Sequence, residues 1–129
     1  MQCDDTGAIT WVNASFALKY GLHDPRAALG RTLEEVFRQA WTAAGTPDAP
    51  ACVQGLQTLR EMMRFTGAPF ELTLPGPRTV RVQARPGVDS VHLYAHIDIT
   101  ELRLQQERLA EAEQAARDSA TALARESAL

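Results

Sequence analysis

Two stretches in the first half of the chain place apolar residues at helical spacing. In TLEEVFRQAW they recur at i, i+3, i+4, i+7 and i+8, and Thr32 and Glu35 have the spacing of a capping box. The predicted buried stripe consists of Leu33, Val36, Phe37, Ala40 and Trp41. A longer helix is predicted from about Ala51 to Phe65, with Val53, Leu56, Leu59 and Met63 facing inward.

Shorter elements precede these helices. The segment CDDTGAITWVN predicts a strand end, a tight turn at Gly7, and a second strand from Ala8 to Val12, because glycine supplies the positive φ of such a turn. Asn13 is a predicted helix N-cap, and the short helix behind it stops at Gly21. One face of that helix carries Phe16, Ala17 and Tyr20. The segment HDPRAALG predicts a single helical turn.

After Gly67 the apolar period changes to two, which is typical of strands. Three strands with short turns between them predict an antiparallel meander. Their apolar positions are Phe70, Leu72 and Leu74, then Val80, Val82 and Ala84, then Val91, Leu93, Ala95 and Ile97. In the third strand we expect the apolar set to face the helices, and His92, Tyr94 and His96 to line the outer or partly covered face. The whole order predicts an α+β fold, with one sheet and helices on one face.

The last predicted strand continues into a long helix with no glycine or proline between them. Asp98 and Glu101 have the spacing of N-cap and N3, so the helix can begin at the strand end. Within it a heptad repeat places Leu102, Leu109, Ala116 and Leu123 on one seam, with Gln106, Glu113 and Ala120 four residues on. This seam is weak and predicts a marginal parallel dimer. The alternative is a solitary exposed helix, which is marginal in water.

Composition limits the classes of protein that need to be considered. The 129 residues suffice for one compact domain plus an appendage, which we assign to residues 1–98 and 99–129. The net charge is -3, and the 13 Lys and Arg residues form no basic face, so a nucleic-acid partner is not expected. No apolar run suggests a membrane span or a signal peptide, so we expect a cytoplasmic location. Cys3 and Cys52 lack metal or redox spacing and are interpreted as structural residues.

The order of elements and two motifs resemble the PAS sensor family, in particular the bacterial modules found upstream of signalling enzymes. In DDTGAITWVNASF the matching residues are Asp5, Gly7, Trp11, Asn13 and Phe16. Gly30 and Arg31 match the family's glycine-polar step, FELTLPGPRTVRVQARP matches its hairpin, and the Asp-Ile-Thr tripeptide of HIDITELR is formed by Asp98, Ile99 and Thr100. The resemblance implies a five-stranded antiparallel sheet in the order 2-1-5-4-3. Only four residues precede the first turn, so either the first strand is shortened or Met1 is not the natural start, and we favour a fragment of a longer protein.

Members of this family bind flavin, haem, small metabolites or nothing. A flavin adduct is disfavoured because GRTLEEVF has Thr32 and Leu33 where the light-sensing subgroup has its cysteine, and haem is disfavoured because the 51–65 helix has no histidine. The cofactor is otherwise unknown. His92 and His96 could bind a metal with Asp98 or a cysteine as a further ligand, but two histidines fall short of a closed tetrahedral site, so no metal is predicted. With no phosphate loop or serine elbow in the sequence, we do not expect an enzyme. The enzymatic alternative is a small α+β enzyme that uses His92 or His96.

Apolar residues of the helices and strands are candidates for lining a ligand cavity, and the alternative is that they fill a packed core. They are Phe16, Tyr20, Leu33, Val36, Phe37, Leu56, Met63, Phe70, Leu72, Val82 and Leu93. The resulting hypothesis is a sensory module that binds a small ligand, or relays a signal, and acts on a downstream output domain through the junction Asp98, Ile99 and Thr100 and a homodimeric helix. The resemblance implies a histidine kinase or a diguanylate cyclase as that domain. The alternative is a ligand-free PAS dimerisation spacer.

Overall fold

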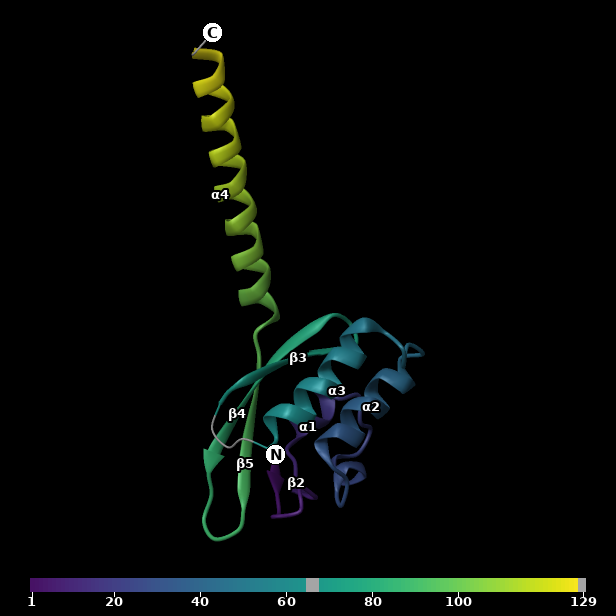
Figure 1. Cartoon of the computed structure of the whole chain (residues 1–129). Helices are drawn as coiled ribbons and strands as arrows, with labels where there is room; N and C mark the ends of the chain where they lie inside the picture. Colours follow the sequence, from purple (N-terminus) through teal and green to yellow (C-terminus); the bar gives the residue numbers. More distant parts are fainter. Residues whose placement is uncertain (65–67, 128–129) are drawn as a thin grey trace. The chain divides into compact units, whose positions relative to one another are not determined.

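The computed structural model describes residues 1–64 and 68–127, drawn in colour in Figure 1. The chain divides into two compact units, Met1–Ile99 and Thr100–Leu129. The first unit contains a sheet and the shorter helices, and the second contains one long helix. The predicted end of the 51–65 helix at Phe65, and Gly67 beyond it, lie outside the described residues.

A five-stranded antiparallel sheet forms the centre of the first unit. Its strands are β1 (Gln2–Cys3), β2 (Ile9–Trp11), β3 (Phe70–Leu74), β4 (Arg78–Pro86) and β5 (His92–Asp98). They lie in the order β2-β1-β5-β4-β3, which confirms the predicted architecture. The two residues of β1 pair with both β2 and β5. The central strand of the sheet is therefore β5, which is also the last strand of the chain.

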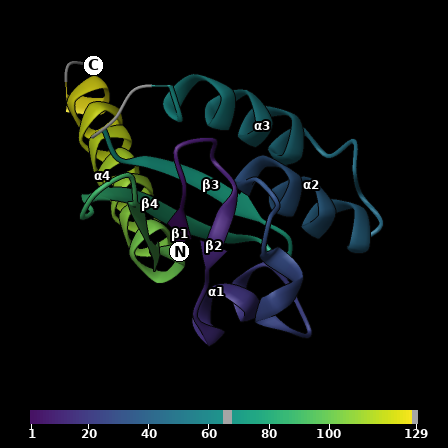
Figure 2. The same cartoon turned by 90° about the horizontal axis from the view of Figure 1, so that it is seen from below.

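Helices cover one face of this sheet (Figure 2). They are α1 (Ala14–Lys19), the 3-10 turn η1 (Pro25–Ala28), α2 (Leu33–Ala43) and α3 (Pro50–Met62). Two of the three predicted caps are present: Asn13 Oδ1 accepts a bond of 2.8 Å from the backbone N–H of Phe16, and Thr32 Oγ1 accepts one of 3.2 Å from that of Glu35. The third, Asp98, is instead the last residue of a strand, and the long helix begins at Thr100. The buried face of α2 consists of the predicted residues Leu33, Val36, Phe37, Ala40 and Trp41.

The inward face of α3 differs from the prediction. Val53, predicted to face inward, is 59% exposed. Cys52, Gly55 and Leu59 are the buried residues of this helix, while Leu56 and Met63 are partly buried against the core. The error arises at Gly55, where a Cβ atom would collide with the ring of Phe37. A glycine has no apolar side chain to mark it as inward, so the pattern of apolar residues gave a stripe rotated by one residue.

The predicted faces of β5 are also reversed. His96 pairs with the buried Val82 and contacts α1, while Ile97 is 43% exposed and pairs with Arg81. Tyr94 packs against the core from the same face as His96. Both faces of this strand carry side chains with apolar surface, so its period of two does not fix which set faces inward. The pairing with β4 decides it, because Val80 and Val82 of that strand are fully buried.

The second unit is the helix α4 (Thr100–Ser127), 28 residues long. None of its described residues is buried, and the seam residues Leu102, Leu109 and Leu123 are 51%, 61% and 63% exposed. Ile99 is the only residue between the end of β5 and the start of α4. No helix in the described part of the chain is both long and apolar enough to cross a membrane.

Candidate functional site

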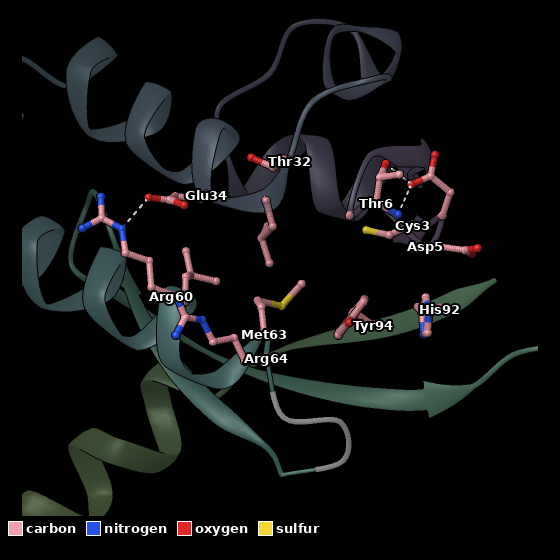
Figure 3. Close-up of a pocket in the computed structure, with 14 residues that line it drawn as sticks. Cys3, Asp5, Thr6, Thr32, Glu34, Arg60, Met63, Arg64, His92 and Tyr94 are labelled. Carbon is pink, nitrogen blue, oxygen red and sulfur yellow. Dashed lines mark hydrogen bonds and ion pairs between the residues drawn. The ribbon is translucent and has the colours of Figure 1, made fainter. Parts of the chain in front are cut away.

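A cleft of about 480 Å³ opens beside the β1–β2 turn of the first unit (Figure 3). It is bounded by that turn, by the N-terminal end of α2, by the C-terminal end of α3, and by β5. The lining residues are Cys3, Asp4, Asp5, Thr6, Gly7, Thr32, Leu33, Glu34, Leu59, Arg60, Met63, Arg64, His92 and Tyr94. This volume lies within the range of about 300–1,000 Å³ that is usual for small-molecule sites.

The β1–β2 turn is held by the side chain of Asp4. Its Oδ1 accepts hydrogen bonds from Thr6 Oγ1 at 2.6 Å, from the Thr6 backbone N–H at 2.9 Å, and from the Ala8 backbone N–H at 3.1 Å. The Thr6 hydroxyl contributes most to lowering the pKa of this carboxyl. Gly7 supplies the positive φ of 86° that the turn requires. The Asp4 carboxylate is therefore engaged within its own turn.

Basic side chains gather at the opposite end of the cleft. Arg60 Nε donates to Glu34 Oε1 at 2.9 Å, and Arg38 Nη2 lies 3.4 Å from the same oxygen. Arg64, one helical turn beyond Arg60, forms no hydrogen bond or ion pair with other residues of 1–64 and 68–127. Figure 3 shows both arginines at the end of the cleft near Glu34, away from Thr6 and His92.

The middle of the cleft is largely apolar. Leu33 and Leu59 form part of the buried core, and Met63 and Tyr94 are partly buried against it. Burial raises the pKa of the Tyr94 hydroxyl and raises that of the Cys3 thiol to about 11, so both groups are uncharged near neutral pH. A thiol with such a pKa is a poor nucleophile. The cleft can therefore bind a ligand through apolar contact and through charge, and its thiol is not activated for covalent chemistry.

The structure places the predicted cavity residues in three different surroundings. Those buried in the continuous core are Phe16, Tyr20, Leu33, Val36, Phe37, Phe70, Leu72 and Val82. Leu56 and Met63 are partly buried against that core. Leu93 alternates with His92 and Tyr94 along β5 and pairs with Gln2 and Arg85, so it points to the other face of the sheet. Of the predicted cavity residues, Leu33 and Met63 line the cleft.

The sequence-based prediction of a cavity was limited to apolar and aromatic residues, so it did not include the polar residues that line the cleft. Arg60 and Arg64 follow each other at i, i+4 spacing on the predicted helix, which places two cations on one face. The i, i+4 spacing of Arg60 and Arg64 is thus the feature of the sequence that could have indicated a basic site. It does not reveal that the face borders a cleft, since the cleft depends on the approach of the β1–β2 turn and of α2.

His96 forms a second notable contact, inside the first unit. Its Nε2 lies 3.0 Å from the Tyr20 hydroxyl oxygen, and its ring meets the ring of Phe16 edge to face at 5.1 Å. Burial lowers the pKa of His96 to about 3, so the imidazole is neutral at physiological pH. His92 is exposed. Among the residues that the structure describes, no group of three or more His, Cys, Asp or Glu side chains could hold a metal ion.

The end of β5 is tied to the start of β4. Arg78 Nη1 donates to Asp98 Oδ2 at 2.8 Å, and the backbone N–H of Ile99 donates to the carbonyl of Thr79 at 2.9 Å. Of the predicted junction residues, Asp98 and Ile99 thus belong to the first unit, and Thr100 begins the second. The last two residues before α4 are held by the sheet.

Comparison with protein-family models, with curated proteins and with solved structures finds no match to the chain. The sheet topology, the cleft and the strand-to-helix junction are therefore the grounds on which a function can be proposed.

Proposed function

We propose that the chain is a PAS-type regulatory module, which binds a small ligand or relays a signal and passes it to a downstream output domain through a dimeric helix. The output domain would be of the histidine kinase or diguanylate cyclase type. The module itself has no catalytic role in this proposal, and its location is cytoplasmic.

One observation carries the proposal: the central strand of the sheet leads within one residue into a long helix with an exposed apolar seam. β5 pairs with β1 on one side and with β4 on the other. Any ligand that shifts the strand would therefore act on the residue that precedes α4. Leu102, Leu109 and Leu123 recur at heptad spacing and are all more than half exposed. This exposure is expected for the seam of a coiled-coil helix when a single chain is considered. Two arrangements of a marginal helix pair can differ by only a few kcal/mol, which suits a switch.

The dimeric helix is tested by light scattering on the full chain and on two leucine variants. Leu109 lies on the seam, whereas Leu104, which is 46% exposed, falls on the opposite side of the same helix. Leu109→Glu should convert a dimer into a monomer because it places like charges at the seam, and Leu104→Glu should leave the dimer intact. A monomeric full chain, or equal masses for the two variants, would contradict the dimeric transmitter.

A ligand-free dimerisation spacer is the second candidate. The continuous burial of Phe37, Val36 and Leu72 favours it, because these predicted cavity residues occupy the core. The cleft beside the β1–β2 turn favours the sensor. Native mass spectrometry of freshly purified protein separates the two: a retained small molecule supports the sensor, and a bare chain in every preparation supports the spacer.

A further inference from the structure

The cleft has a basic end and an apolar floor. Arg60 and Arg64 lie at the basic end, and Met63 lies between them and Tyr94 (Figure 3). Leu33 and Leu59 add further apolar surface to the lining. A ligand that fills this space meets a cationic group at one end and hydrocarbon along its length.

The basic end has an excess of positive charge. Glu34 is the carboxylate that lines this end, and its Oε1 is shared between Arg60 at 2.9 Å and Arg38 at 3.4 Å. One carboxylate thus serves two guanidinium groups, and Arg64 forms no ion pair among the described residues. The other carboxylates of the lining, Asp4 and Asp5, belong to the β1–β2 turn, and Figure 3 shows Asp5 at the far end of the cleft.

We infer that the cleft takes a small carboxylate with an apolar body. Its carboxylate pairs with Arg64, whose planar guanidinium matches two carboxylate oxygens at once, and its body lies on Leu33, Leu59 and Met63. Inorganic phosphate or acetate can pair with Arg64 but makes no contact with the apolar lining. A neutral amide of the same shape contacts the apolar lining but forms no ion pair with Arg64. This inference rests on the proposed function, in which the cleft is the sensory site.

The ligand class is tested by NMR titration of the full chain with hexanoate, and with hexanamide and acetate as comparison probes. Hexanoate should bind saturably and shift the backbone resonances of residues around the cleft. Hexanamide and acetate should each bind at least about tenfold more weakly than hexanoate. Hexanamide lacks the hydrogen bond from a charged group and acetate lacks several buried methylenes, and each loss is worth at least that factor. No saturable binding of hexanoate, or equal affinity for hexanamide, overturns the inference.

Two arginine variants locate the charge. Arg64→Gln should remove the preference for hexanoate over hexanamide, while Arg81→Gln should retain it, because Arg81 alternates with the buried Val80 and Val82 and so projects from the opposite face of the sheet. An Arg64→Gln protein that still prefers hexanoate overturns the assignment. The light-scattering mass of the full chain decides the dimeric transmitter separately, so a failed titration with an intact dimer refutes the ligand class alone.

Discussion

The Nε2 atom of His96 lies 3.0 Å from the hydroxyl oxygen of Tyr20, a contact that links the central strand of the sheet to the C-terminal end of α1. Tyr20 is 2% exposed, and the pKa of its hydroxyl is raised by burial. Both groups are neutral at physiological pH, so the contact is an uncharged hydrogen bond, and, besides burial, the positive charges of the Met1 amino group and Lys19 lie close enough to help keep His96 neutral. His96 therefore lies on the helix-facing side of β5 and is partly buried against α1, although its strand position suggested the outer face.

Replacing Tyr20 by phenylalanine should lower the free energy of unfolding by about 1–3 kcal/mol, because the largely buried imidazole nitrogen then lacks a partner. Urea denaturation monitored by circular dichroism measures the change. The control is Tyr94→Phe, which removes a hydroxyl that forms no hydrogen bond with the described residues and should cost less than about 0.5 kcal/mol. Equal effects of the two variants would mean that the contact with His96 contributes nothing.

The low pKa of His96 predicts a loss of stability in mild acid. The folded pKa is about 3, below the ordinary value of 6.5, so between these values the unfolded chain binds the proton and the folded protein does not. The contribution of His96 to the free energy of unfolding is therefore fully present above pH 6.5, and it decreases as the pH falls toward 3. Between pH 7.5 and 5.5 the free energy of unfolding should decrease by about 1.4 kcal/mol from this residue.

Urea denaturation at those two pH values measures this decrease, and the variant His96→Leu serves as the control. The carboxyl groups of Asp4 and Asp24, whose pKa values are lowered by hydrogen bonds from Thr6 and Arg26, titrate at lower pH and remain in both proteins. The loss of stability between the two pH values should be smaller by about 1.4 kcal/mol in the leucine variant, while the Met1 amino group, whose pKa is also lowered by burial, titrates in both proteins. If both proteins lose stability equally over this interval, the imidazole is not the source.

The element order of the fold could be predicted from the sequence, because the periods of α2 and of the meander strands are set by local patterns of apolar residues. The stripe from Leu33 to Trp41 is buried as predicted. The rotation of α3 about its axis could not be predicted, since it depends on the ring of Phe37 entering the space that Gly55 leaves open. The face of β5 likewise depends on its register against Val82, which is a long-range pairing.

The candidate site was harder to predict than the fold. Its lining comes from four elements that are distant in sequence, and no single segment carries its pattern. Arg64 and Thr6 line the same cleft only because the fold brings the β1–β2 turn and the C-terminal end of α3 close together. The predicted cavity residues are apolar and central, so most of them became core.

Substituting Gly55 by alanine should destabilise the protein by about 1–3 kcal/mol, although alanine is the better helix former. The added Cβ collides with the Phe37 ring, which is fully buried and cannot move into solvent. Thermal or urea unfolding measures the loss. The double variant Gly55→Ala with Phe37→Leu should cost less than the sum of the two single changes, because the smaller side chain makes room for the methyl group. Strict additivity would contradict direct contact between these positions.

The two cysteines should react slowly with a thiol reagent in the native protein. Cys3 is 1% exposed and Cys52 is fully buried, and burial raises the pKa of both thiols, so little thiolate is present at pH 8. The absorbance change with Ellman's reagent should be slow in buffer and rapid in 6 M guanidinium chloride. Cys3→Ser and Cys52→Ser, each with a single remaining thiol, assign the rates. Rapid labelling of Cys3 in the native Cys52→Ser protein would mean that the cleft wall opens readily beside β1, whereas slow labelling of both shows that it stays closed.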